Sequence, residues 1–102
     1  MGLNRYEIFL KVAEVGNITR AAELLHYTQA GVSHSIAALE REAGVPLLIR
    51  GSNGVTLTEN GKRLIQPIQT LVNDQRALEQ SIFEINEVVA GTLRLGAFTS
   101  VA

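Results

Sequence analysis

The stretch from Ile18 to Ala37 constrains the fold of this 102-residue chain more than any other. Its pattern predicts two short helices joined by a tight turn. When the second helix, Gln29 to Ala43, is projected at about 100° per residue, its apolar side chains share one narrow sector. The members of this buried stripe are Val32, Ile36, Leu39 and Ala43. The opposite side carries Ala30, His34, Ala37 and Arg41, with Ser33 on its flank.

This outer side is small, polar and weakly charged. A helix that faces only solvent more usually carries Lys and Glu there. Small side chains with hydroxyl, amide or imidazole ends allow a helix to approach another surface closely, and the major groove of DNA is one such surface. The pattern therefore indicates a helix that binds something large.

Turn and capping residues divide the first half of the chain into three helices. We expect them over residues 3–15, from a cap at Asn17 or Thr19 to about Leu25, and from Gln29 to Ala43. Gly16 and Gly44 are expected to end the first and third helices, as a glycine after the last turn commonly does. Thr28 is the expected cap of the third.

Two short β-rich segments follow, Leu47 to Arg50 and Val55 to Thr58. The residues between them, Gly51-Ser52-Asn53-Gly54, are a hairpin-turn signal. The predicted fold is mainly α: a three-helix winged helix-turn-helix domain over residues 1–58. Its helix-turn-helix covers about residues 18–37, and a small β-hairpin wing covers about residues 47–58.

A long helix is predicted from Glu59 to about Val89, with Thr58 as its cap. Its side chains recur at alternating steps of four and three residues, which is the a/d seam of a coiled coil. A helix of about 31 residues spans about 46 Å, which the three-helix unit is too small to cover. We therefore expect residues 59–90 to pair with a second copy, although packing on the same domain is the alternative. The expected dimer interface is Leu64, Ile68, Leu71, Gln75, Leu78, Ile82 and Ile85.

Residues 91–102 alternate apolar Leu93, Leu95 and Ala97 with smaller or polar residues, which predicts a strand. One strand is not stable alone, so we expect it to be the first strand of a further, truncated domain.

Composition excludes several classes of protein. The chain has no Cys, which excludes disulfides and thiolate metal sites, and His26 and His34 lack the supporting ligands of a metal site. No apolar run approaches about 18 residues and no signal peptide is recognised, so we expect a cytoplasmic protein without a membrane partner. No catalytic arrangement is recognised, so an enzyme is not expected.

The net charge of −1 counts against the simplest nucleic-acid-binding protein, which is basic. Five basic residues nevertheless lie in or beside the helix-turn-helix and wing: Arg20, Arg41, Arg50, Lys62 and Arg63. Several acids lie close to them. We therefore expect weak DNA binding by one copy and useful affinity only from two.

The run AAELLHYTQAGVSHSIAALEREAGVPLLIRGSNGVTLTENGKRL resembles the N-terminal winged helix-turn-helix of LysR-type transcriptional regulators. Four features stand where that family has them: the paired Ala21-Ala22, the GVPL segment, Arg50 and the LT-x-x-G motif from Leu57. The resemblance extends over the long helix, and LRLGA matches the first strand of the family's effector-binding domain.

The resemblance implies a dimeric, sequence-specific regulator that binds double-stranded DNA. The third helix would enter the major groove, and the wing would touch the minor groove or the backbone. The linker helices would pair to form the dimer, and full-length members are commonly tetramers. No cofactor is implied for this fragment, but a small-molecule co-inducer is implied for the missing C-terminal domain.

By position, the resemblance assigns the base-reading end of the third helix to Gln29, Ala30, Ser33 and His34. It places Arg50 and Asn53 in the wing, and it makes Thr28, Ser35 and Arg20 candidates for phosphate contacts. Three positions depart from the family's pattern: Ala30-Gly31 replaces a proline-alanine type of pair, His34 replaces a frequent Arg, and Leu48 replaces a Phe.

Each assignment has an alternative. Gln29 and His34 are either base contacts or solvated side chains, and Ser33 either contacts DNA or bonds a carbonyl of its own helix. Arg50 either binds DNA or pairs with an internal acid, and Asn53 either contacts DNA or supplies a left-handed turn residue. The alternative function is a winged-helix protein-interaction module that dimerises through its long helix. A molybdate-responsive type of regulator has a similar winged domain, but LRLGA argues against it.

Overall fold

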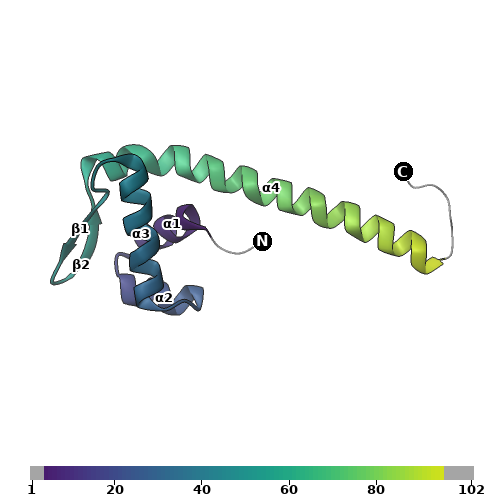
Figure 1. Ribbon diagram of the computed structural model, residues 1–102, viewed down its shortest axis with the longest axis horizontal. Coiled ribbons are helices and arrows are strands. Elements are labelled where there is room, and N and C mark those ends of the chain that lie inside the picture. The colour runs from purple at the N-terminus through teal and green to yellow at the C-terminus, as the bar shows by residue number, and fades with distance from the viewer. Residues whose placement is uncertain (1–3, 96–102) are drawn as a thin grey trace. The chain divides into compact units, whose positions relative to one another are not determined.

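The computed structural model describes the backbone of residues 4–95 and the side chains of residues 4–87. The elements, in order, are α1 (Arg5–Val15), α2 (Ile18–Leu25), α3 (Gln29–Ala43), β1 (Leu48–Gly51), β2 (Gly54–Leu57) and α4 (Glu59–Leu95) (Figure 1). The chain divides into two compact units, Met1–Val72 and Asn73–Ala102. The first unit holds the three short helices, the hairpin and the start of α4. The predicted mainly α, winged helix-turn-helix architecture is confirmed.

Side-chain oxygens begin each of the three short helices. Asn4 forms a capping box with Glu7 at the start of α1. The Asn17 side chain accepts from the Arg20 N–H at 2.8 Å, and the Thr28 hydroxyl accepts from the Gly31 N–H at 2.9 Å. Each cap satisfies a backbone donor that the first helical turn leaves unpaired and is worth about 1 kcal/mol. The predicted cap at Thr28 is confirmed, and Asn17, not Thr19, caps α2.

Left-handed residues end the same helices. Gly16 ends α1 with φ 75° and Gly44 ends α3 with φ 78°. His26 ends α2 with φ 60°. This left-handed conformation is unfavourable for a residue with a side chain, and glycine usually occupies such a position. These breaks produce the tight α1–α2 and α2–α3 turns that the helix-turn-helix needs.

One core joins the helices to the wing and to the start of α4. It is made of Ile8, Phe9, Val12, Ile18, Ala21, Ala22, Val32, Ile36, Leu39, Leu47, Leu48, Ile68 and Val72. Burying each large apolar side chain contributes about 1.5–3 kcal/mol. The two alanines of α2 are small where α2 meets both α1 and α3. Val32, Ile36 and Leu39 of the predicted stripe therefore form the buried side of α3. Ala43, the fourth predicted member, is exposed, because it lies in the last turn of the helix, beyond the core.

The wing is an antiparallel pair in which Leu48 faces Leu57 and Arg50 faces Val55. Its base is tied to the start of α4, because Thr58 donates its N–H to the Leu47 carbonyl at 3.0 Å. The Thr58 hydroxyl donates to the Pro46 carbonyl at 2.8 Å and accepts from the Gly61 N–H at 3.0 Å. Thr58 thus caps α4, as predicted, and also closes the hairpin.

The structure corrects the prediction for part of the long helix. Ile68 is only 6% exposed and Val72 is fully buried, both in the core of the first unit. Ile68 is therefore covered by its own chain and is not available to a partner, and Leu64 is partly buried against the same core. The heptad spacing is the same whether a helix packs on its own domain or on a second copy, so the pattern alone does not separate the two.

The predicted strand is also corrected for residues 92–95, which are helical because α4 continues to Leu95. Within residues 4–95 the strands are β1 and β2, and they pair only with each other, so a strand at 92–95 would have no partner there. The remainder of the predicted strand, residues 96–102, lies outside the described residues. None of the helices in the described part of the chain has a stretch long and apolar enough to cross a membrane.

Candidate nucleic-acid interface

The outer side of α3 is an exposed ridge, as the helical projection predicts. We use the term ridge for Ala30, Ser33 and His34. Ala30 and His34 are exposed and Ser33 is half-buried. The ridge is backed by the buried stripe on the opposite side of the same helix, so its backbone is held rigidly by the core. Gln29, also exposed, stands in the first turn of α3 beside the ridge.

The polar side chains of this surface are free of protein partners. Within the described residues, Gln29, Ser33, His34 and Ser35 make no side-chain hydrogen bond to the protein. The alternative in which Ser33 bonds a carbonyl of its own helix is therefore wrong. Ser35 is half-buried and projects about 150° away from the middle of the ridge, so α3 does not bring it together with the other candidates.

The two candidates before α3 are engaged but exposed. The Thr28 oxygen accepts the Gly31 N–H, which leaves its hydroxyl proton to donate to a phosphate. The Arg20 guanidinium forms an ion pair with Glu23 at 3.3 Å, and both side chains are largely exposed. Exposed pairs of this kind are worth little, about 0–1 kcal/mol, so a phosphate can compete for Arg20.

Arg50 and Asn53 stand on the wing. Arg50 lies in β1 and is exposed, and within the described residues no carboxylate pairs with it, so the alternative of an internal acid is wrong. Asn53 is exposed in the turn, but the positive φ belongs to Gly54, at 121°. Asn53 therefore does not supply a left-handed residue.

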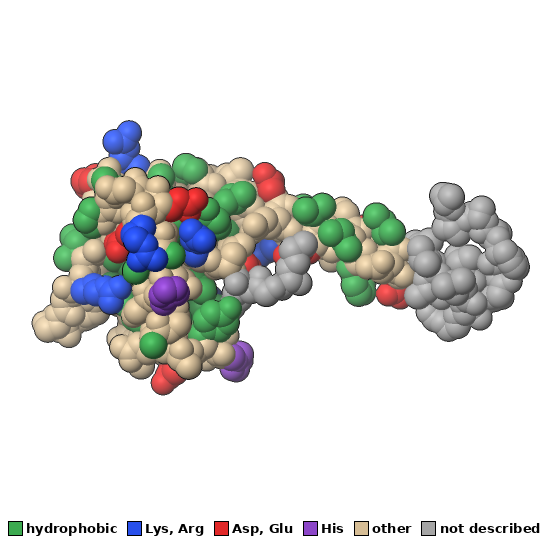
Figure 2. All heavy atoms as spheres, in the orientation of Figure 1, with side chains coloured by type: hydrophobic (Ala, Val, Ile, Leu, Met, Phe, Trp, Pro, Cys, Tyr) green, Lys and Arg blue, Asp and Glu red, His purple; other side chains and the backbone are tan. Residues whose placement is uncertain are grey.

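The charges around these elements are unevenly paired. Arg5, Lys11, Arg20 and Lys62 form exposed ion pairs with nearby glutamates. Among the described residues, Arg41, Arg50 and Arg63 have none. Figure 2 shows histidine and Lys or Arg side chains on one face over α3 and the hairpin. Arg41 on α3 and Arg50 on β1, which have no ion-pair partner among the described residues, therefore contribute positive charge to these elements, although acidic side chains lie on the same face.

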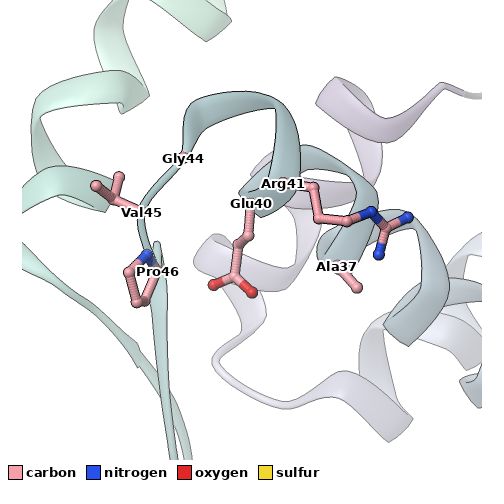
Figure 3. A pocket seen from close by; sticks show the side chains of 6 residues that line it. All are labelled: Ala37, Glu40, Arg41, Gly44, Val45 and Pro46. Atoms are coloured by element: carbon pink, nitrogen blue, oxygen red, sulfur yellow. The ribbon is translucent and has the colours of Figure 1, made fainter.

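The predicted site does not include Arg41, although the helical projection places this residue on the outer side of α3. It is exposed on the last turns of α3, where it lines a shallow hollow with Ala37, Glu40, Gly44, Val45 and Pro46 (Figure 3). The signal that could have found it is its helical spacing from His34, seven residues away.

A cluster of three side chains joins the start of α1 to the end of α3. The Tyr6 hydroxyl donates to the Glu42 carboxylate at 2.9 Å, and Arg5 pairs with the same carboxylate at 3.3 Å. The hydrogen bond to Glu42, followed by burial and the carboxylate's negative charge, raises the pKa of the Tyr6 phenol above its ordinary value. This clamp fixes α1 against the end of α3. No group of three or more His, Cys, Asp or Glu within the described residues is arranged to hold a metal ion.

The comparisons with known proteins agree with this geometry. The model of the family described as bacterial regulatory helix-turn-helix proteins, lysR family, matches residues 3–62, which is more than half of the chain. The chain belongs to the LysR family. It is 34% identical to the HTH-type transcriptional regulator YvbU of Bacillus subtilis over 103 residues, covering 100% of this chain and 35% of YvbU. This chain spans about a third of the length of the curated relatives it matches.

Two similar solved structures are DNA complexes of LysR-type proteins. DarR of Vibrio fischeri in complex with DNA superposes with a TM-score of 0.74 at 34% identity, covering 86% of this chain and 31% of DarR. The CbnR DNA-binding-domain complex with DNA superposes with a TM-score of 0.70 at 30% identity, covering 79% of this chain and 94% of that chain. The chain is therefore the DNA-binding domain of a LysR-type transcriptional regulator, followed by further helix.

Proposed function

We propose that this domain binds double-stranded DNA sequence-specifically, with α3 in the major groove and the wing at the minor groove or the backbone. The observation that carries the proposal is the ridge on α3. It is exposed, small and without internal hydrogen-bond partners, on a helix whose other side is anchored in the core. A recognition helix needs both an exposed outer side and a rigid support, because its side chains read DNA bases through short, direct hydrogen bonds.

Individual side chains take separate roles in this proposal. Gln29 is suited to a bidentate contact with adenine, and His34 donates to guanine or to a phosphate. Arg50, without an internal partner, is available to the backbone or the minor groove, and Asn53 stands beside it at the tip of the wing. Thr28 and Arg20 are placed to bind phosphates, which position the domain without specifying sequence.

We propose that two copies pair through the exposed seam of α4, from Leu71 onward. Leu78, Ile82 and Ile85 repeat at coiled-coil spacing there, and Leu78 is 56% and Ile85 63% exposed in the single chain. Figure 2 shows apolar side chains recurring along α4. Gln75 occupies one seam position and can set the register, and Leu71 is the first exposed member of the seam. The buried Ile68 is not part of this interface.

Two copies would double the number of phosphate contacts, which offsets the weak charge of one domain. In a longer protein with a C-terminal effector domain, the same domain would respond to a small co-inducer, act within a cytoplasmic tetramer and have no catalytic role. These last points rest on membership of the LysR family alone.

A selection experiment tests the proposal. The purified chain is mixed with a pool of randomised duplexes, bound duplexes are recovered, and affinity is measured by fluorescence anisotropy at several salt concentrations. We expect one motif to be enriched and the affinity to fall steeply with salt, by about 0.9 in log–log slope for each phosphate neutralised. Arg50→Ala should reduce that slope by about one. Recovery of no common motif, together with binding that ignores salt, would favour the protein-interaction module instead.

A further inference from the structure

The side chain of Glu40 joins α3 to the wing. Its Oε2 atom accepts the backbone N–H of Leu47 at 2.7 Å and that of Leu48 at 3.1 Å. Both leucines are in the core, 0% and 7% exposed. Hydrogen bonds from N–H groups to an ionised carboxylate are shorter and about twice as strong as those to a neutral oxygen. Glu40 thus fixes the point at which β1 begins.

This connection has no substitute within the described part of the chain, because no other hydrogen bond there joins α3 to the wing. The remaining attachments of the hairpin lead elsewhere. Val55 donates its N–H to the Gly16 carbonyl in the α1–α2 turn at 2.9 Å, and Thr58 bonds the segment at the base of the hairpin.

The orientation of Glu40 differs from that of the next residue. Figure 3 shows the Glu40 carboxylate directed to the side of the segment around Pro46, while Arg41 extends the other way. A carboxylate directed at DNA would be repelled by phosphate. Glu40 is half-buried and turned inward to two backbone donors, so its charge is used within the protein.

We propose that Glu40 is a positioning residue of the DNA interface, which sets the place of the wing relative to the ridge on α3. The inference rests on the proposed function. Arg50 lies two residues after Leu48, about 7 Å along β1. A tilt at the start of the strand therefore displaces Arg50 while His34, on α3 itself, stays in place. Because hydrogen bonds to DNA tolerate only a few tenths of an ångström, a shift of about 1 Å is enough to remove the wing contact.

A double-mutant cycle tests this role directly. Binding of the full 102-residue chain to a duplex recovered by selection is measured for Glu40→Ala, Arg50→Ala and the double variant. We expect Arg50→Ala to weaken binding about tenfold in the parent and less than about threefold in the Glu40→Ala background, because the displaced wing no longer makes the contact. His34→Ala should cost the same factor in both backgrounds.

Glu42→Ala is the matched control. It removes the same charge from the same helix, but its carboxylate holds Tyr6 and Arg5, not the wing. In that background Arg50→Ala should keep its full tenfold cost. Glu40→Gln retains an acceptor oxygen. In the Glu40→Gln background, Arg50→Ala should therefore weaken DNA binding by a larger factor than it does in the Glu40→Ala background.

The outcomes separate the inference from the proposed function. If Arg50→Ala costs tenfold with and without Glu40, the positioning role is overturned while DNA binding through the wing stands. If neither Arg50→Ala nor His34→Ala changes binding in the parent, the proposed interface itself is wrong. If Glu40→Ala does not fold, the cycle is run with Glu40→Met, which keeps the length of the side chain but removes the carboxylate acceptor, and an unchanged cost of Arg50→Ala in that background also overturns the inference.

Discussion

The contact between the wing and the α1–α2 turn can be broken at one atom. Gly54 has φ 121°, a conformation that side chains rarely adopt. A Cβ on Gly54 would also collide with the Gly16 carbonyl oxygen. That oxygen accepts the Val55 N–H at 2.9 Å, so the strand cannot retreat without losing the bond. Gly54→Ala therefore both strains the backbone and detaches the wing from the α1–α2 turn.

The cost can be worked out from these two parts. Forcing a residue with a side chain into a sparsely populated conformation costs about 1–3 kcal/mol. Losing the hydrogen bond from Val55 costs about 0.5–1.5 kcal/mol more. We expect Gly54→Ala to lower the free energy of unfolding by about 2–4 kcal/mol, a large part of the roughly 5–15 kcal/mol of an ordinary domain.

Two other glycines are matched controls. Gly44 has φ 78° but no atom within 4 Å of an added Cβ, so Gly44→Ala should cost only the left-handed conformation, about 1–2 kcal/mol. At Gly51 the nearest atom to an added Cβ is the Gly54 oxygen at 3.8 Å, an ordinary contact. Gly51→Ala should therefore change stability by less than about 0.5 kcal/mol.

Urea unfolding followed by circular dichroism measures all three variants. The protein concentration is kept constant, because association of copies would shift the apparent stability. We expect the loss to be smallest for Gly51→Ala, intermediate for Gly44→Ala and largest for Gly54→Ala. If Gly54→Ala costs no more than Gly44→Ala, the wing is not held against the α1–α2 turn and the reasoning fails.

Three further predictions concern a pKa, an interface and a cap. The raised pKa of Tyr6 means that its stabilising bond to Glu42 is fully present below the pKa of the unfolded phenol and is lost as pH rises through the higher folded value. Urea unfolding between neutral and strongly alkaline pH should therefore show an alkaline loss of stability in the parent that Tyr6→Phe lacks, and equal curves would contradict the bond. Leu78→Asp should give a monomer by light scattering while Phe83→Asp, 59% exposed but off the seam, should remain a dimer; equal effects would mean that the seam is not the interface. Thr28→Ala should cost about 1 kcal/mol in unfolding free energy, whereas Thr28→Ser should cost much less, and no difference between them would argue against the cap.

Local signals predicted much of the fold and the exposure of the outer side of α3. The caps at Asn17 and Thr28, the stop at Gly44 and the hairpin are short-range features, and each depends on residues within a few positions. The exposed ridge followed from helical spacing alone, because the residues that bury one side of α3 define the other side. The same spacing placed Arg41 outward, although its lack of an ion pair appears only in three dimensions.

Other features depend on which element meets which, and the sequence pattern does not carry that information. Ile68 has the spacing of a coiled-coil residue but fills the core of its own domain. Leu93 and Leu95 alternate like a strand, yet the backbone is helical there. The bonds from Glu40 to the start of β1 cross the α3–β1 turn, and a glutamate beside Leu39 gives no sign of them in the sequence.

The central claim is that the exposed side of α3 reads base sequence, and a repeated selection tests it most directly. Gln29→Ala, His34→Ala and a control, His26→Ala, are each selected against the same randomised duplex pool, and the enriched motifs are compared with that of the parent. We expect Gln29→Ala and His34→Ala each to relax preference at particular positions of the motif, by about 1–3 kcal/mol for a lost bidentate contact, while His26→Ala keeps the parental motif. Parental motifs from both α3 variants, with only a uniform change in affinity or none, would contradict the claim.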